Sequence, residues 1–427
     1  MPAGVSREVQ GYRWLIFALL STSYILVYFH RLCVSVLAVD LMNDLNAGGS
    51  LIGVLGAAYF YSYAVMQLPA GLLSDSWGPR KTITLFFVVA SIGSVILGLA
   101  PTAAWAIVGR TIAGIGIAML FVPTLKILAE WFTPREFASM TGLLLAMGGI
   151  GSLIAATPLV WLSNWIGWRS SFVFIGWITL CLAVLVGLFV RNRPSDKGWQ
   201  PLTAPAESRS TAVGLGQAVR HVLSCRHFWP VAVWFFFDFA IFFSLGGLWG
   251  GPYLMHVHHL SKAETGHILS MMALGLVVGS PLLCWLSDRV FRRRKPVLLL
   301  TSVGMMLITA LMTFTTAIPG WGLYVLFFML TVCGNAVGAV AFTMNKEMFP
   351  VAMAGTATGL VNLFPFVGGA VFQPLVGFLL ERHGRTGDIF SPSAYQSAFM
   401  VLWVCSWIAL GAALLSRETM TDGRMGG

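Results

Sequence analysis

Long runs of hydrophobic positions alternate along the chain with short segments rich in charged residues, proline and glycine. Because a helix needs about 20 apolar residues to cross a hydrocarbon core of about 30 Å, each run of that length predicts a membrane span. The first run is longer than the core of a signal peptide and lacks a small-residue cleavage site, so we expect it to be retained. The pattern predicts an all-α membrane protein with twelve transmembrane helices, at residues 14–37, 51–73, 82–100, 104–129, 138–162, 170–190, 228–250, 266–286, 297–317, 321–344, 356–380 and 397–415.

The composition and the charge distribution agree with a membrane protein. Of the 427 residues 57% are hydrophobic and 10% are charged, and the mean hydropathy of +0.81 exceeds what a soluble domain of this size tolerates. The net charge of +10 could indicate nucleic-acid binding, but with both termini in the cytoplasm 19 of the 26 Lys and Arg residues lie on cytoplasmic segments. We therefore expect cytoplasmic termini, a lipid bilayer as the surrounding, and no nucleic-acid partner.

A polar segment at residues 191–227 divides the spans into six and six, and the two halves resemble each other. The stretches EWFTPREFASMTGL (130–143) and EMFPVAMAGTATGL (347–360) share five residues at a constant offset of 217, and GLLSD ending at Asp75 matches CWLSD ending at Asp288. An offset near half the chain length indicates a duplicated six-helix unit, which many secondary transporters use for alternating access. The predicted domains are an N-terminal bundle (1–190), a cytoplasmic linker (191–227) and a C-terminal bundle (228–427).

The loop after the second span contains the motif GLLSDSWGPRKT (71–82), and the fourth span contains GRTIAGIG (109–116). The first resembles the signature loop of the major facilitator superfamily, and the second resembles its fourth-helix motif, in which an intramembrane arginine, here Arg110, precedes glycines. The resemblance implies the major facilitator fold, with two pseudo-symmetric six-helix bundles and a charged loop that gates the cytoplasmic end. The loop's motif positions are filled by Gly71, Asp75, Gly78, Arg80 and Lys81.

Departures from related patterns narrow the expected transport mode. Drug/proton exchangers of the superfamily carry a Gly-Pro pair in the fifth helix, where this chain has Thr157-Pro158, so symport or uniport is expected rather than exchange. Organic anion:cation symporters often show Tyr-x-Asp-Arg in the first helix, and here His30 replaces the proton-binding Asp, so carboxylate-sugar symport of that type is not expected. The chain is more similar to the proteobacterial group that includes phagosomal amino-acid and nucleoside transporters and some siderophore carriers. This similarity implies a bacterial inner membrane, with an internal membrane compartment as the alternative.

Polar side chains in the first span recur at helical spacing. Ser21, Tyr24, Tyr28, Arg31 and Ser35 follow steps of three and four, which places them on one helix face. We expect this face to bind substrate, because an arginine can hold a carboxylate or phosphate through two parallel hydrogen bonds. The alternative is that Arg31 reaches out to lipid headgroups. His30 projects about 100° away from Arg31, as a proton-coupling group or as a packed neutral histidine.

Two further spans carry the same kind of pattern. Tyr59, Tyr63 and Gln67 share a face of the second span, and the two tyrosines are candidate substrate contacts. Asp238 lies about ten residues into the seventh span, near the bilayer midplane, and is the main candidate for carrying the coupling proton. The alternative is a structural ion pair between Asp238 and Arg110, which is also a proton-coupling candidate.

The remaining candidates are amides and one charged pair. Lys126 and Glu130 lie one turn apart near the inner end of the fourth span, where they either pair with each other or Lys126 faces the floor of a cavity. We group both residues, together with Asp288, with the gating loop. The amides suit an amino or hydroxyl group of a substrate, although hydrogen bonding between helices is the commoner use. They are Asn335, Asn362 and Gln373.

Metal and nucleotide chemistry are not predicted. His256, His258 and His259 in the loop after the seventh span have a spacing compatible with a transition metal, but a solvated loop explains them as well. A nucleotide-binding Gly-x-x-x-x-Gly-Lys-Ser/Thr loop does not occur, so we expect no cofactor and no ATP-driven transport. The motifs HExxH and GxSxG are also missing, so we do not expect an enzyme.

These features predict a secondary active transporter for a small polar metabolite, an amino acid or similar. We expect a monomer that works by alternating access, with protons as the coupling ion in a symport reaction. A carrier of iron, another metal or a metal chelate is the first alternative. An organic-anion symporter and a non-transporting membrane sensor with the same fold are the second.

Overall fold

The protein is almost entirely helical in a computed structural model that describes residues 7–200, 215–383, 385–386 and 389–420. Residues 201–214 of the predicted linker lie outside the described residues. The elements up to the linker are α1 (Arg7–Asp44), α2 (Gly49–Ser76), α3 (Pro79–Gly98), α4 (Ala103–Ala118), α5 (Phe121–Trp131), α6 (Pro134–Ile154), α7 (Thr157–Phe189) and the 3₁₀ helix η1 (Pro194–Lys197). Those that follow are α8 (Leu215–Ser224), α9 (Phe228–Ser244), η2 (Leu245–Trp249), α10 (Gly250–His256), α11 (Lys262–Trp285), η3 (Leu286–Val290), α12 (Lys295–Phe314), α13 (Gly320–Thr331), η4 (Val332–Ala336), α14 (Gly338–Glu347), α15 (Val351–Val361), α16 (Leu363–Arg382), β1 (Arg385–Thr386), β2 (Ile389–Phe390) and α17 (Pro392–Leu415).

The helical segments confirm a multi-span protein. Among the described residues, 11 helices are long and apolar enough to cross a membrane, and a shorter apolar helix covers Ser139–Ile154. The predicted boundary between the fifth and sixth spans, residues 163–169, contains the non-helical Gly167 (φ 80°, ψ 158°), where two helices meet within α7. The fifth predicted span is itself interrupted, because α6 ends at Ile154 and α7 begins at Thr157. The reason is Pro158: the residue before a proline disfavours helical backbone, and proline suits the first turn of a new helix.

Several predicted spans are interrupted within their length. α4 ends at Ala118 and α5 begins at Phe121, while α15 and α16 meet at Asn362. The elements η2 and η4 are π-helical turns inside the seventh and tenth predicted spans. Irregular backbone at membrane depth is tolerated where it is buried in protein or lines a cavity, and π-helical turns are frequent at functional sites. These interruptions therefore mark segments where binding residues are expected.

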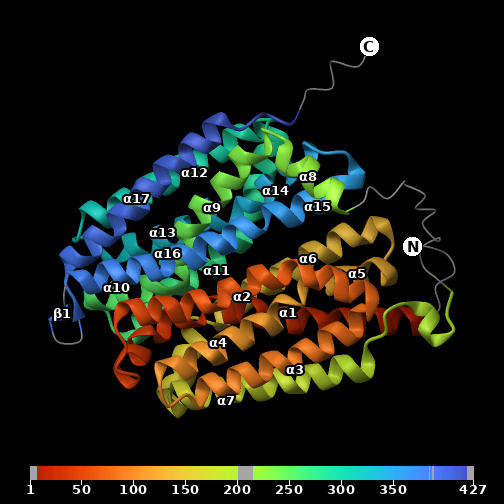
Figure 1. Cartoon of the computed structure of the whole chain (residues 1–427), viewed down its shortest axis with the longest axis horizontal. Helices are drawn as coiled ribbons and strands as arrows, with labels where there is room; N and C mark the ends of the chain where they lie inside the picture. The colour runs from red at the N-terminus through yellow and green to blue at the C-terminus, as the bar shows by residue number, and fades with distance from the viewer. Residues whose placement is uncertain (1–6, 201–214, 384, 387–388, 421–427) are drawn as a thin grey trace. The chain divides into compact units, whose positions relative to one another are not determined.

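The structure divides into two compact units, of which the first contains Met1–Arg31, Ser62–Ala155 and Leu162–Ser208. Within this unit α3 lies between α4 and α7 (Figure 1). Glycine permits the close approach to α4, because a Cβ on Gly93 would lie 2.7 Å from the carbonyl oxygen of Gly109. Small residues at such crossings are typical of helix packing in membranes.

Replacing Gly93 with alanine is expected to destabilise the first unit, because the added methyl group must push α3 away from α4. Overpacking of this kind costs about 1–3 kcal/mol. Gly142 of α6 offers a matched control, since nothing lies within 4 Å of a Cβ built there. Thermal unfolding in detergent should show a lower midpoint for Gly93→Ala than for Gly142→Ala. Equal midpoints would contradict the close approach of the two helices.

The second unit contains Leu32–Tyr61, Ala156–Trp161 and Arg209–Gly427. In this unit α9 packs against α16 and α17, and α17 also packs against α12 (Figure 1). β1 and β2 form a two-stranded antiparallel pair. Because the units are defined by packing and each contains segments from the first half of the chain, the predicted domain boundaries at residues 190 and 228 stay a prediction.

The later part of α1 and the first part of α2 belong to the second unit. The backbone amide of Gly251 in α10 donates to Ser35 Oγ at 3.2 Å, and Lys262 of α11 forms an ion pair with Asp40. A Cβ on Gly53 of α2 would lie 2.7 Å from the carbonyl oxygen of Gln373. These contacts tie α1 and α2 to α10, α11 and α16.

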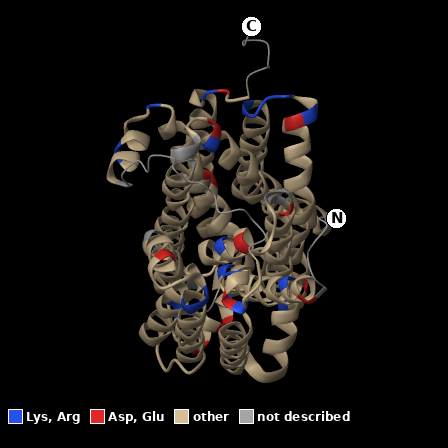
Figure 2. Ribbon diagram, turned by 90° about the vertical axis from the view of Figure 1, so that its right-hand side faces the viewer, with Lys and Arg blue, Asp and Glu red and all other residues tan. Residues whose placement is uncertain are grey.

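Charged residues are sparse along the helices, and most of the ribbon in Figure 2 carries neither basic nor acidic side chains. Burying a basic or acidic side chain is costly unless it is paired or serves a function. The buried side chains of this kind in the described part of the chain are therefore the first places to look for the site. They are His30, Arg31, Arg110, Asp238 and His256.

Candidate substrate and proton sites

Arg31 is the centre of an aromatic group in the first unit. Its side chain is only 7% exposed, and its guanidinium carbon lies 4.5 Å from the ring centroid of Tyr28 and 5.5 Å from that of Tyr63. Tyr63 is also hydrogen-bonded to Arg31 and Gln67. The burial contrasts with an arginine that reaches out to headgroups, whose charged end would be exposed. The stacking fixes a planar cation with its hydrogen-bond donors in a defined direction.

The two tyrosines of the predicted polar face contact each other and one further ring. The rings of Tyr24 and Tyr28 lie 5.8 Å apart, and Tyr24 also contacts Phe121 at the start of α5, with ring centroids 5.6 Å apart. Phe121 was not among the predicted site residues, because its contact with Tyr24 depends on tertiary structure. Tyr59, predicted to share a face with Tyr63, belongs to the second unit, where its ring packs edge-on against Phe60 at 5.4 Å.

His30 faces away from the tyrosines, as its place on the helix predicts. It is buried, and its Nε2 lies 3.4 Å from the Oγ of Ser94 in α3. Arg110 of α4 is near enough for its charge to act on the imidazole, and is itself buried. The arrangement brings together two of the three predicted proton-coupling residues in the first unit.

Asp238 of α9, in the second unit, is fully buried, with 0% of the residue exposed. Neither carboxyl oxygen has a hydrogen-bond partner among the described residues, and no ion pair of this side chain occurs in that part of the chain. The ring of Trp234, one turn earlier, directs its Nε1 to Ser302 Oγ at 2.9 Å instead. One turn later, Phe242 lies against Gly334 of the π-helical η4. A negative charge in such surroundings is costly, which suits a carboxyl group that takes up and releases a proton.

The three predicted amides have different surroundings. Asn335 lies in η4 and is half-buried, and Asn362 is the residue between α15 and α16. Gln373 is buried, and its Nε2 donates to the carbonyl oxygen of Phe243 at 2.7 Å. The indole of Trp249 donates in turn to the Gln373 carbonyl oxygen at 2.9 Å. Gln373 therefore holds α16 against α9 and η2, which is the structural use of an amide in a membrane protein.

An ion pair joins the motif loop of the first unit to α5. Asp75 of α2 pairs with Lys126 of α5, whose ammonium also lies 3.3 Å from the carbonyl oxygen of Gly71. Pairing of Lys126 with Glu130, one of the two arrangements considered from the sequence, is wrong because the lysine reaches across to α2. Glu130 itself is exposed.

The rest of the motif fixes the start of α3. Gly78 has φ 87°, a left-handed backbone that suits glycine and precedes the first turn of the helix. Arg80 donates from Nε to the carbonyl oxygen of Gly187 near the end of α7 at 2.9 Å. A cation at the carboxyl end of a helix is favoured by the helix dipole. The Arg80 side chain therefore joins the start of α3 to the end of α7, and Lys81 is exposed.

The repeat of the motif in the second unit is also a charge cluster. Arg294 pairs with Asp288 and with Glu347, the latter at 3.0 Å. Burial works against the charge on Arg294, but hydrogen bonds to Glu347 and Asp288 outweigh it and raise the pKa of the guanidinium. Glu418, after α17, accepts hydrogen bonds from the amides of Arg294 (2.8 Å) and Lys295 (3.0 Å) at the start of α12. The sequence repeat aligns Glu347 with Glu130, so the position of Glu347 could be found from the sequence. No sequence pattern pointed to Glu418.

The histidines after the seventh span are engaged by tyrosines. His256 is buried with its Nδ1 3.0 Å from the Tyr395 hydroxyl, and His258 Nε2 lies 3.2 Å from the Tyr253 hydroxyl. Burial lowers the pKa of His258, and His259 lowers it further. Among the described residues no three His, Cys, Asp or Glu side chains are grouped to hold a metal ion, so the structure gives no support to metal capture here.

Within the described part of the chain, the structure combines apolar helices of membrane-spanning length with a buried arginine, a buried carboxyl group and charge clusters at helix ends. The chain belongs to the Major Facilitator Superfamily, whose family model matches residues 20–251 and 236–424. The predicted fold class, with twelve transmembrane helices, is thereby confirmed.

Several relatives named as transporters align with nearly the whole chain. The probable sulfoacetate transporter SauU of Cupriavidus necator is 26% identical, with 96% of this chain and 95% of the relative aligned. The probable hexose phosphate transport protein of Chlamydia pneumoniae is 21% identical over 95% of this chain and 93% of its own. The hexuronate transporter of Escherichia coli is 24% identical over 90% of both chains.

Solved structures show the same fold. A bacterial homologue of the human lysosomal transporter Spinster, in an inward-facing and unoccupied conformation, superposes with a TM-score of 0.77 at 18% identity, covering 97% of this chain and 98% of that one. A D-xylose-proton symporter superposes with a TM-score of 0.73 at 16% identity, covering 96% of this chain and 98% of that one.

Proposed function

We propose that the protein is a secondary transporter for a small organic anion, with Arg31 as the residue that binds the anionic group. The observation that supports this most directly is the buried guanidinium, held between the rings of Tyr28 and Tyr63. A guanidinium held in this way binds a carboxylate, sulfonate or phosphate through two hydrogen bonds of fixed direction. Tyr24, next to Tyr28, provides a further polar contact for the rest of the substrate.

The names of the relatives support the anionic substrate class. Sulfoacetate, hexose phosphates and hexuronates differ in size, but each carries at least one anionic group, and the proteins named for them align with nearly the whole chain. Among the functions that the sequence left open, the organic-anion symporter is therefore the one we favour. A carrier of amino acids or nucleosides, as the proteobacterial group suggested, is the second candidate, supported by the half-buried amide of Asn335.

We also propose that transport is coupled to protons through Asp238. Its carboxyl group is fully buried and has no hydrogen-bond partner among the described residues. Neutralisation of the group by a proton removes the cost of the buried charge, so the proton is a suitable switch for a conformational change. The remaining parts of the proposal are a monomer in a bacterial inner membrane with both termini in the cytoplasm, which moves its substrate by alternating access.

Uptake into proteoliposomes tests the substrate class. We expect accumulation of one or more of sulfoacetate, glucuronate and glucose 6-phosphate, and none of a neutral sugar such as xylose, when a proton gradient is imposed. Neutral and cationic amino acids, nucleosides and a ferric chelate complete the panel. Accumulation of one of these in place of every organic anion would contradict the proposal and favour the alternatives.

A further inference from the structure

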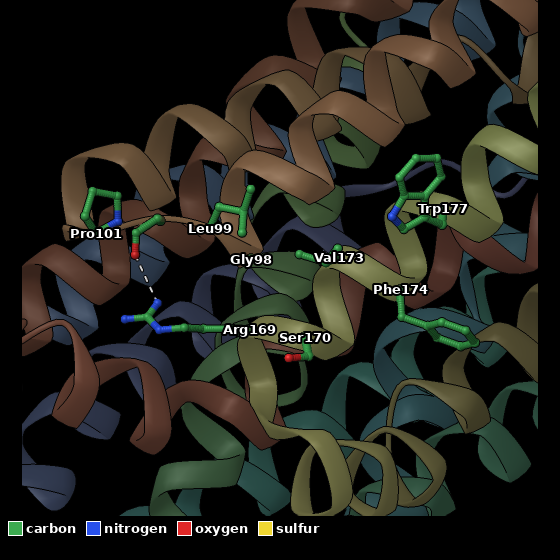
Figure 3. Close-up of a pocket in the computed structure, with 9 residues that line it drawn as sticks. Gly98, Leu99, Pro101, Arg169, Ser170, Val173, Phe174 and Trp177 are labelled. Carbon is green, nitrogen blue, oxygen red and sulfur yellow. Dashed lines mark hydrogen bonds between the residues drawn. The ribbon is translucent and has the colours of Figure 1, made fainter.

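A cavity of about 670 Å³ in the first unit lies outside the residues of the transport proposal. It opens where the end of α3 and the following loop meet α7, shortly after the non-helical Gly167. A Cβ on Gly98 would lie 2.5 Å from the carbonyl oxygen of Arg169, so the two segments are in close contact at the floor. The residues that line the cavity are Gly98, Leu99, Ala100, Pro101, Arg169, Ser170, Val173, Phe174 and Trp177 (Figure 3).

Most of the cavity wall is apolar and accessible. Leu99 is 68% exposed, Phe174 50% and Trp177 62%, and all three lie in or beside membrane-spanning helices. Side chains of this kind at membrane depth contact acyl chains rather than water. Arg169 and Trp177 are eight residues apart on α7, so the wall extends about 12 Å along the helix axis. That length matches the upper half of a lipid acyl chain rather than a small solute.

Arg169 provides a single fixed charge at one end of this wall. Its Nη1 donates to the carbonyl oxygen of Ala100 at 3.0 Å, and its guanidinium carbon lies 4.3 Å from the ring centroid of Trp168. Figure 3 shows the guanidinium directed to the loop after α3, with Trp177 at the far end of the cavity. No acidic residue is among the described residues of the lining. The exposed Trp165, four residues before Arg169 on the other side of Gly167, is of the type that marks the level of the headgroups.

We propose that this cavity is a binding site for an anionic phospholipid, with the lipid phosphate on Arg169 and one acyl chain along Val173, Phe174 and Trp177. A cation held in place by a carbonyl oxygen and an indole ring complements a phosphate, and the adjoining wall complements the hydrocarbon chain. A lipid with a zwitterionic headgroup fits the wall equally but presents no net charge to the arginine. The site therefore discriminates between headgroups. It is independent of the substrate and of the coupling ion.

Native mass spectrometry of the delipidated full-length protein tests this proposal. We expect dioleoylphosphatidylglycerol to bind about tenfold more tightly than dioleoylphosphatidylcholine, and Arg169→Gln to abolish that difference. Trp177→Ala should weaken the binding of both lipids, because it shortens the apolar wall. Arg382→Gln is the matched control, since Arg382 is an exposed arginine at the end of α16 and should leave both affinities unchanged.

Three results would overturn the proposal: equal binding of the two lipids by the wild-type protein, the same loss in Arg382→Gln as in Arg169→Gln, or binding of glycerol phosphate as tight as that of the lipid. The last would indicate a site for a free anion. Because Arg169→Gln also removes the bond to Ala100 and could fail to fold, a second measurement uses the wild-type protein alone. A photoactivatable phosphatidylglycerol should label residues 169–177, and labelling confined to other segments would contradict the assignment.

Discussion

Arg31→Ala is expected to reduce the initial rate of organic-anion uptake by about 30-fold or more, because loss of one partner of a buried, hydrogen-bonded charge pair costs about 2–5 kcal/mol. Arg31→Lys should retain part of the activity. It keeps the positive charge but loses the planar group that stacks on Tyr28 and Tyr63. Uptake into proteoliposomes at subsaturating substrate measures both variants, and a substrate-induced shift in the unfolding temperature measures binding directly.

Two variants make this result specific. Tyr63→Phe removes the hydrogen bond to Arg31 but keeps the ring, so its loss should be smaller than that of Arg31→Ala. Arg382→Ala removes an exposed arginine of the second unit and should transport at the wild-type rate. Wild-type uptake and binding by a folded Arg31→Ala protein would show that the anion is bound elsewhere. An equal loss in Arg382→Ala would show a general effect of charge.

Local helical spacing was sufficient to predict the centre of the candidate site. Tyr24, Tyr28 and Arg31 follow steps of three and four, and the structure stacks the guanidinium on one of these rings. The same spacing separated His30 from them, and His30 faces α3. Such contacts depend on one helix alone, which is why they can be inferred before the fold is known.

Contacts between helices could not be inferred in this way. Lys126 has Glu130 as its nearest acid along the chain, yet its partner is Asp75 of another helix. Gln373 carries an amide group that could bind a substrate, but its Nε2 donates to the carbonyl oxygen of Phe243 in α9. In both cases the partner is a group that only tertiary packing brings within reach.

The arrangement of the spans was also predicted only in part. Hydrophobic runs gave the number of spans, because burial in lipid requires a minimum apolar length. They did not locate the break between α6 and α7 inside the fifth predicted span, because that break depends on Pro158 and not on a polar loop. At this position the restricted backbone before a proline, and not the hydropathy, determines where the helix ends.

The substrate class rested on a weaker inference. The missing acid beside Arg31, with His30 in its place, argued against the type of carboxylate-sugar symport known for organic anion:cation symporters. Arg31 and its tyrosines, however, are compatible with any small organic anion, and relatives named for sulfoacetate, hexose phosphate and hexuronate align with most of the chain. The residue that binds the anion and the residue that carries the proton must therefore be identified separately. In this chain the candidate for the second is in another helix, α9.

Asp238→Asn is expected to abolish proton-driven accumulation while leaving exchange of internal for external substrate intact. The amide keeps the shape of the protonated carboxyl group but cannot release a proton, so substrate should equilibrate across the membrane and not accumulate. With one proton per substrate, a gradient of one pH unit supports about tenfold accumulation in the wild-type protein. The variant should reach a ratio near one at every gradient.

The comparison of accumulation with exchange separates the roles that Asp238 can have. Asp40→Asn is the matched control in the same unit, because the carboxylate of Asp40 is already paired with Lys262 and should not carry the coupling proton. If Asp238→Asn still accumulates substrate as the wild type does, the proton is carried by another group and the assignment is wrong. If a folded Asp238→Asn protein loses exchange as well as accumulation, the carboxyl group is needed for the conformational change itself. Because Arg31 lies in the other unit, failure of the coupling assignment would leave the anion assignment standing, and substrate binding to Asp238→Asn measures that independence directly.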